Sequence, residues 1–277
     1  AALMTSIAAV IFAQSDTPSQ SLENVIILYI SLPLLAAGIL AIFVNRDIFN
    51  RKPILNQLPF FQALKSSFQS KRVVLLAGIV FCAYFLYLGT FDFPAYVEKS
   101  RGATKVFGAQ LGAARDWMRP MAALLAGVLA DRFRTSRVLS VCFFGLLLSF
   151  GSLAWTPDDV PITLLVWIQI LTAAIAAFAL RGIYFAAIEE LGFPVSRTGL
   201  IVGTVSIIGF MPDIFVHLLS GFFVDQLGWT SGFRSLFGIY ALVAIAGLGC
   251  SFFLQKASID NENKYKSLPA GRNTPIQ

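Results

Sequence analysis

The stretch from Val106 to Val138, VFGAQLGAARDWMRPMAALLAGVLADRFRTSRV, decides the fold class of this chain. Its first part, to about Ala130, is long enough to cross a bilayer, which takes roughly 20 mostly apolar residues. Three charged residues nevertheless lie near its middle, namely Arg115, Asp116 and Arg119. A charge at mid-bilayer costs on the order of 3 kcal/mol or more, so such residues usually face a bundle interior or a watery cavity. The pattern favours a solute path; the alternative is an internal salt bridge that only pins helices together.

The composition of the chain is that of a membrane protein. Of its 277 residues, 57% are hydrophobic and 13% are charged, whereas roughly a quarter of the residues in a soluble domain are charged. Apolar runs of bilayer length recur along most of the chain, so we predict an all-α, polytopic transmembrane helical bundle. The net charge of +6 does not indicate nucleic-acid binding, because the basic residues cluster in loops on one side of the membrane.

The reactive residue types do not form a metal or nucleophile site in the sequence. The three cysteines, Cys82, Cys142 and Cys250, all lie inside apolar runs, which favours buried small residues over a disulfide framework or a metal site. There is one histidine, no H-E-x-x-H pattern and no Cys–His arrangement. We therefore expect no bound metal, no cofactor and no enzymatic activity.

The apolar runs predict the order of the elements. Residues 1–13 are too short to span and are expected to be the tail of a helix that begins upstream, whereas residues 24–44 form a full span. Residues 45–72 predict a basic loop that carries an amphipathic helix on the membrane surface, and 255–277 a polar, disordered tail. Between them we predict six further spans, at residues 73–97, 106–130, 138–155, 162–187, 198–224 and 235–254.

The distribution of basic residues predicts the orientation. About 14 of the 21 Lys and Arg residues fall in 45–72, 131–137, 188–197 and the tail, which by the positive-inside rule face the cytoplasm. The C-terminus is then cytoplasmic, and the expected location is a plasma membrane, of the bacterial inner-membrane type. The exception is the loop at 98–105, which has three basic residues on the outer side.

Two motifs resemble turns of the major facilitator superfamily. Gly127-x-Leu129-Ala130-Asp131-Arg132, between two spans, resembles the cytoplasmic loop signature G-x-L-a-D-r-x-G-r-k. Arg134 stands at its second Gly and Thr135-Ser136 at its two basic positions, with Arg137 as their replacement. Gly221-Phe-Phe-Val-Asp225-Gln-Leu-Gly228-Trp229, followed by Phe233, is similar to the G-x-l-x-D-x-x-G-W-x-x-x-F turn before the last helix of a half.

The resemblance implies an architecture and a function. Family members have twelve helices in two sixes joined by a long cytoplasmic loop, so residues 1–44 correspond to the last one and a half helices of the first half. Residues 45–72 correspond to the linker and 73–254 to the complete second half, and the missing N-terminal half of the same protein is the expected partner. The implied function is secondary active transport of a small solute by alternating access of two rocking bundles.

Arginine and tyrosine side chains supply the predicted solute site. Arg115 and Arg119 are four residues apart and share a helix face, where forked hydrogen bonds could hold a carboxylate or phosphate. Tyr84 and Tyr87 could line the cavity, although such aromatic residues more often pack in the core or against lipid. A small organic anion is the predicted substrate.

Carboxylates and the histidine supply the predicted proton-coupling groups. Asp116 lies three residues before Arg119 and can pair with it. Asp213 and His217 are four apart on one face and could take and release a proton; the alternative for His217 is a packing residue. Asp92 could be a proton site or outer gate, or a helix-end charge that reaches water. The predicted gating residues are Gly127, Asp131, Arg132, Arg137 and Arg181, the last of which could also be a snorkelling anchor.

Two other classes of function remain as alternatives. A seven-helix receptor is one, but its retinal-binding form needs a lysine in the final span, and residues 235–254 contain none. A membrane-embedded enzyme is the other, and it lacks a recognisable site. Both are less favoured than transport of a small solute across the lipid bilayer.

Overall fold

The computed structural model describes residues 18–43, 68–157, 164–193 and 197–266, together with positions 62 and 66. The chain divides into two compact units, Ala1–Phe60 and Phe61–Gln277. Every ordered element in the described ranges is helical, which confirms the predicted all-α membrane bundle. The predicted amphipathic helix of the 45–72 loop falls mostly outside the described residues.

The described part of the first unit is one helix, α2 (Pro18–Phe43). Its apolar side chains are exposed nearly all round, as Ile26, Leu34 and Ile42 illustrate. A helix that is apolar on every side is typical of a membrane span, so α2 agrees with the predicted span at residues 24–44. Pro33 lies inside it.

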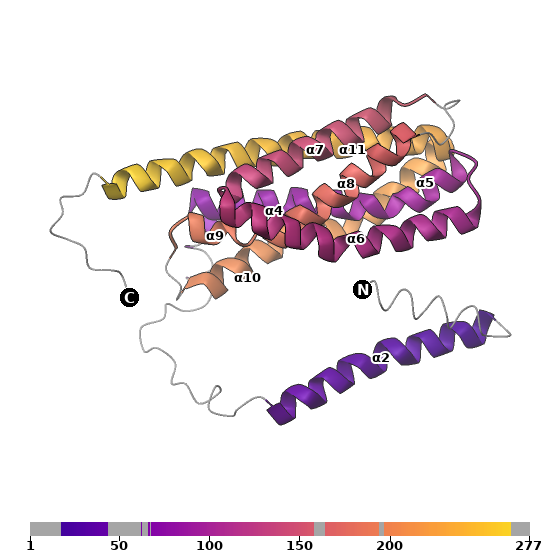
Figure 1. Ribbon diagram of the computed structural model, residues 1–277, viewed down its shortest axis with the longest axis horizontal. Coiled ribbons are helices and arrows are strands. Elements are labelled where there is room, and N and C mark those ends of the chain that lie inside the picture. The colour runs from indigo at the N-terminus through magenta and orange to yellow at the C-terminus, as the bar shows by residue number, and fades with distance from the viewer. Residues whose placement is uncertain are drawn as a thin grey trace. The chain divides into compact units, whose positions relative to one another are not determined.

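The second unit is a bundle of long helices that lie side by side (Figure 1). Its elements are α4 (Lys71–Gly89), η2 (Thr90–Asp92), α5 (Phe93–Lys99), α6 (Lys105–Arg132), α7 (Thr135–Trp155), α8 (Leu164–Ile183), α9 (Ala187–Glu190), α10 (Thr198–Gly209) and α11 (Pro212–Lys266). Among the described residues, four stretches are long and apolar enough to cross a membrane: Lys71–Lys99, Thr135–Trp155, Leu164–Ile183 and Thr198–Asp260. The 28-residue α6 has the length of a span but carries the charged residues of the opening stretch.

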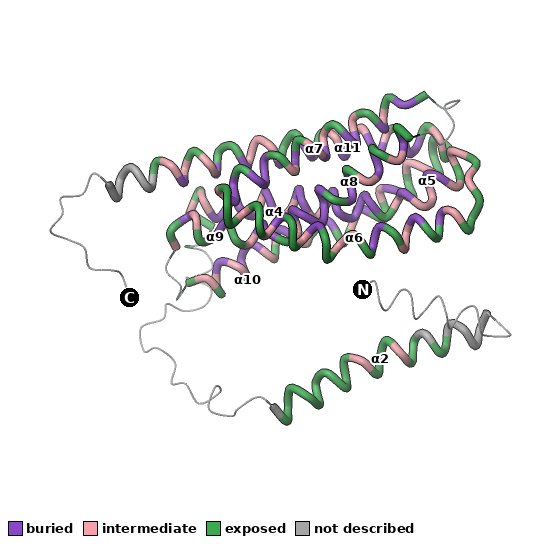
Figure 2. The backbone as a smooth tube through the Cα atoms, viewed as in Figure 1, coloured by how far each residue is buried: buried purple, intermediate pink, exposed green. Residues whose placement is uncertain are grey.

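The interior of the bundle is rich in aromatic rings, and its outer surface is apolar too. Phe150, Phe237 and Tyr240 are fully buried, and the rings of Phe150 and Tyr240 meet edge to face with centroids 5.1 Å apart. Large apolar residues such as Leu124 and Val141 are exposed instead. Buried and exposed positions therefore alternate around the helices of the bundle (Figure 2), and apolar residues on both faces are typical of membrane helices.

The predicted span at residues 73–97 contains a break. The α-helix gives way to the 3-10 turn η2 and resumes as α5, with Pro94 in its first turn. Proline has no N–H, so Pro94 cannot close an α-helical hydrogen bond to the carbonyl of Thr90 four residues earlier. That carbonyl is left available to another donor.

The gap between the last two predicted spans implies a loop at residues 225–234, and this loop is much shorter in the structure. The residues on both sides are helical, and α11 consists of two helices that meet at Gly228, whose φ of 78° and ψ of 172° are not helical. This backbone conformation is essentially restricted to glycine. The chain therefore reverses within about one residue, and the two parts of α11 run back alongside each other (Figure 1).

The predicted start of the disordered tail is also wrong. Helix α11 does not end near Leu254 but continues to Lys266. Ser258 in this extension is buried, and its hydroxyl donates a 3.2 Å hydrogen bond to the carbonyl of Glu190. A polar helix that leaves the membrane can continue in this way when it packs on a neighbouring element. Residues 267–277 lie outside the described ranges.

Candidate functional site

Arg115 lies at the centre of the candidate site, in the middle of α6. The residue is only 7% exposed. Its Nη1 donates a 3.1 Å hydrogen bond to the carbonyl of Thr90, the group that Pro94 leaves without a helical donor. The guanidinium carbon also lies 3.9 Å from the ring centroid of Phe91, a cation–π distance. The break between α4 and α5 therefore builds a socket for this arginine.

Asp116 accepts hydrogen bonds from both neighbouring arginines. Its Oδ1 lies 2.9 Å from Nη2 of Arg115 and 3.3 Å from Nη2 of Arg119. The pair with Arg119 confirms the expected i,i+3 contact, whereas the pair with the adjacent Arg115 was not predicted. Two guanidiniums that share one carboxylate leave one uncompensated positive charge.

Arg119 extends the arrangement toward α8. Its Nη2 donates to the hydroxyl of Tyr87 at 3.1 Å, and its guanidinium carbon lies 5.2 Å from the ring centroid of Phe178. The side chain is 34% exposed, so it is more accessible than Arg115. Within the described part of the chain, the buried Nε atoms of both arginines have no hydrogen-bond acceptor. Two donors therefore remain available on one face of α6.

Tyrosines connect the arginines to the other predicted residues. The guanidinium carbon of Arg181 lies 4.1 Å from the ring centroid of Tyr87 and 5.1 Å from that of Tyr84. The hydroxyl of Tyr84 in turn donates a 2.8 Å hydrogen bond to Oδ2 of Asp213. Arg181, predicted as a gating residue, thus lies with the predicted solute-site residues.

We call this set the central polar cluster; it comprises Tyr84, Tyr87, Arg115, Asp116, Arg119, Arg181 and Asp213. Its members come from α4, α6, α8 and α11. The cluster is buried at Arg115 and Asp116, half-buried at Arg181, and exposed at Asp213. A polar path therefore runs from the interior of the bundle to its surface.

Asp92 belongs to a second, neighbouring arrangement. Its Oδ2 accepts a 2.6 Å hydrogen bond from the hydroxyl of Tyr240, and its Oδ1 accepts a 2.9 Å bond from Ser220. Sequence reasoning missed both partners. The sequence gives only a general expectation here, that a hydroxyl inside an apolar span needs a hydrogen-bond partner. Residue spacing does not identify that partner when the two residues lie on different helices.

His217 lies on the same part of α11 as Asp213, but the two do not form a pair. Asp213 bonds to Tyr84, while the ring of His217 meets that of Phe91 edge to face at 6.2 Å. The described residues show no hydrogen bond between them. His217 therefore contacts the same phenylalanine that covers Arg115.

The predicted gating loop lies apart from the central polar cluster. Gly127, Asp131 and Arg132 belong to the end of α6, and Arg137 to the first turn of α7. The side chain of Glu190 accepts from the backbone N–H of Ser136, at 3.2 Å for Oε2. An acidic side chain at a helix N-terminus is favourable, so Glu190 holds the start of α7 against α9.

Comparisons with known proteins place the chain among helical membrane proteins. No family model matches it, and neither does any solved structure. It is 28% identical over 252 residues to the inner membrane protein YqcE of Escherichia coli K12, covering 86% of this chain and 56% of that protein. It is 25% identical over 237 residues to the inner membrane protein YihN of the same strain, covering 82% of this chain and 56% of YihN. The chain thus spans about half the length of these curated relatives.

Proposed function

We propose that this chain is the second transmembrane half of a secondary active transporter of the major facilitator type, which moves a small organic anion by alternating access. In this proposal the complete protein adds an N-terminal bundle and resides in a bacterial inner membrane, with the C-terminus in the cytoplasm. The inner-membrane names of the two relatives and the motifs around Asp131 and Gly228 support it.

The observation that carries the proposal is the pair of arginines on α6. Arg115 and Arg119 share a single carboxylate and each retains an unbonded Nε, in the middle of a helix whose other faces are apolar. A structural pin needs only one cation for one carboxylate. The surplus charge and donors suit an anionic group such as a carboxylate or a phosphate.

Protons are the proposed coupling ion. Asp92 and Asp213 each accept hydrogen bonds from a tyrosine on another helix, so a change in their protonation would alter contacts between helices. Asp116 pairs with both arginines, and the ring of His217 meets that of Phe91, which lies against Arg115. Carboxylates and histidine inside membrane bundles are the usual groups of proton relays.

Uptake into proteoliposomes tests the proposal with the protein in its full natural length. The probes are labelled acetate, succinate and glycerol 3-phosphate, with glucose as the neutral comparison. We expect accumulation of at least one anion, and a decrease of about tenfold in Arg119→Gln, because a charge-assisted hydrogen bond contributes about 1.5–3 kcal/mol. Arg119→Lys keeps the positive charge but cannot form two parallel hydrogen bonds. Its uptake rate should therefore lie between those of the parent protein and Arg119→Gln.

Lys105→Gln is the matched control, because this exposed cation lies at the start of the same helix, outside the cluster. Thermal unfolding of each variant separates loss of binding from loss of folding. Unchanged anion uptake by folded Arg115→Gln and Arg119→Gln proteins would refute the anion site.

A further inference from the structure

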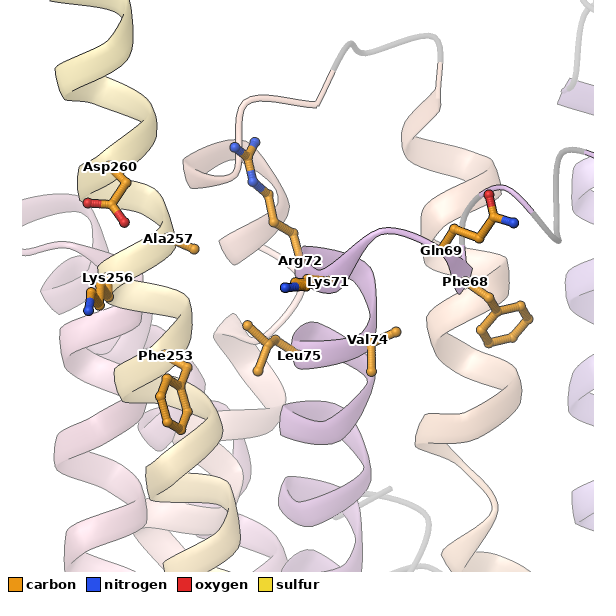
Figure 3. Close-up of a pocket in the computed structure, with 10 residues that line it drawn as sticks. All are labelled: Phe68, Gln69, Lys71, Arg72, Val74, Leu75, Phe253, Lys256, Ala257 and Asp260. Atoms are coloured by element: carbon orange, nitrogen blue, oxygen red, sulfur yellow. The ribbon is translucent and has the colours of Figure 1, made fainter.

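A cleft at one end of the bundle lies well away from the central polar cluster. It has a volume of about 490 Å³ and lies between the start of α4, with the residues just before it, and the last described turns of α11 (Figure 3). Its lining divides into two parts. Lys71, Arg72, Lys256 and Asp260 are charged, whereas Val74, Leu75 and Phe253 are apolar.

The division coincides with the edge of the apolar spans. Helix α4 becomes apolar immediately after Arg72, and the apolar run of α11 ends at Leu254, just before Gln255 and Lys256. Figure 3 shows Phe253 and Leu75 deeper along the two helices than Arg72 and Asp260. Val74 and Phe253 are 49% and 64% exposed, so the apolar part faces outward. The ends of the apolar runs therefore predict that the cleft lies at the level where acyl chains meet headgroups.

The charges around the cleft are unbalanced. Among the described residues that line it, three cations face one carboxylate, which gives these side chains a net charge of +2. Arg72 is held in place by a 3.0 Å hydrogen bond from its Nη1 to the carbonyl of Leu191, while Lys71 and Lys256 are exposed. An anion between the two lysines would offset the excess.

The first turn of α4 adds to this imbalance. It carries Lys71 and Arg72 and no acidic residue, and Ser70 at the N-cap makes no side-chain capping hydrogen bond. Cations at a helix N-terminus oppose the helix dipole, and the N–H groups of the first turn are natural anion ligands. The helix start, the lysines and the apolar surface below them are thus suited to one ligand with a phosphate and a hydrocarbon chain.

We propose that this cleft binds an anionic phospholipid, with the headgroup phosphate between Lys71 and Lys256 and an acyl chain along Leu75, Val74 and Phe253. Basic pockets between helices on the cytoplasmic side are known sites for such headgroups. The orientation predicted from the loops places this end of the bundle in the cytoplasmic leaflet.

Lipid binding to the purified, delipidated full chain in detergent tests the proposal, with native mass spectrometry as the readout. The probes are phosphatidylglycerol and phosphatidylcholine with the same acyl chains. Each lysine near an anionic headgroup contributes about 1 kcal/mol, so Lys71→Gln/Lys256→Gln should weaken phosphatidylglycerol binding by at least about tenfold. Phosphatidylcholine binding should be weak in both proteins.

Two further variants show whether weaker lipid binding comes from the loss of the lysines or from a folding defect. Lys105→Gln, at the other end of the bundle, should leave lipid binding unchanged. Asp260→Asn removes a carboxylate that lines the cleft, so it should strengthen phosphatidylglycerol binding several-fold, which a merely structural residue would not do.

Three results would overturn the proposal. The first is equal retention of phosphatidylglycerol by the double lysine variant, and the second is equal binding of the two lipids. The third is full displacement of phosphatidylglycerol by millimolar glycerol phosphate, which would make the cleft a site for a soluble anion.

Discussion

At the scale of single residues, Asp116 holds two guanidiniums that would otherwise repel each other. It is 8% exposed, and one oxygen accepts from both Arg115 and Arg119. Removing the carboxylate of a buried ion pair leaves an uncompensated buried charge. We therefore expect Asp116→Asn to lower the free energy of unfolding by about 3 kcal/mol, measured by thermal or denaturant unfolding in detergent.

The matched control is Glu98→Gln, the same chemical change in the more exposed pair with Lys99. A surface pair contributes less than about 1 kcal/mol, so this variant should unfold almost like the parent. Arg115→Gln/Asp116→Asn removes one charge of each sign and should recover part of the loss. An Asp116→Asn protein as stable as the parent would show that the carboxylate does not hold the arginines.

The members of the central polar cluster were all candidates in the sequence, but which of them pair was predictable only where the spacing lies within one helix. Asp116 and Arg119 share a face at i,i+3, and this pair is present in the structure. The expected i,i+4 pairing of Asp213 and His217 is not, because Tyr84 on another helix takes the carboxylate. Contacts between helices depend on how the helices are rotated and placed, which spacing along one helix does not contain.

At the scale of elements, the turn inside α11 depends on one glycine. Gly228 has φ 78° and ψ 172°, a conformation that costs other residues about 1–3 kcal/mol. Gly228→Ala should therefore lower the free energy of unfolding by about 2 kcal/mol. The measurement is denaturant unfolding in detergent, followed by helix content.

Gly221 provides the control on the same helix. A Cβ built there meets nothing within 4 Å, so Gly221→Ala should be neutral or stabilise by up to about 1 kcal/mol through helix propensity. If both substitutions had the same effect, the strained backbone at Gly228 would not be the reason for glycine.

The contact between α11 and α7 depends on another glycine. A Cβ at Gly247 would collide with the ring of Phe143, which is fully buried and has little room to move. Overpacking a core typically costs about 1–3 kcal/mol, so Gly247→Ala should destabilise the protein within that range. Thermal unfolding of the detergent-solubilised protein measures the effect.

The neighbouring Gly249 faces open space, with nothing within 4 Å of a built Cβ. Gly249→Ala should therefore leave stability unchanged or slightly improved. Combining Gly247→Ala with Phe143→Leu should reduce the loss of stability, since the smaller leucine leaves room for the added methyl group. Full additivity of the two substitutions would argue against direct contact.

The existence of most spans was predictable from sequence, and their ends were not. Apolar length alone places α6, α7 and α8 close to the predicted ranges. Hydropathy changes at Gln255, yet the second helix of α11 continues past this position to Lys266. A helix backbone satisfies its own hydrogen bonds in water as well as in lipid, so a change in polarity does not by itself end it.

At the scale of the whole molecule, the orientation rests on the basic loops and has one apparent exception. The loop at residues 98–105 carries Arg101 on the predicted outer side. This arginine donates to the carbonyl of Pro157 at 2.6 Å and to the hydroxyl of Tyr96 at 2.8 Å. It therefore holds the end of α7 to α5, and a structural requirement accounts for a cation at this position.

Reporter fusions test the orientation of the full-length protein in cells. The prediction is that alkaline phosphatase joined after Gln277 is inactive and green fluorescent protein at the same point fluoresces, because the basic loops predict a cytoplasmic C-terminus. Fusion of the phosphatase after Pro157, at the opposite end of the bundle, should give an active enzyme. The reverse pattern would place Lys71 and Lys256 in the outer leaflet. It would also show that Arg101 and its neighbours outweigh the larger basic loops in setting the topology.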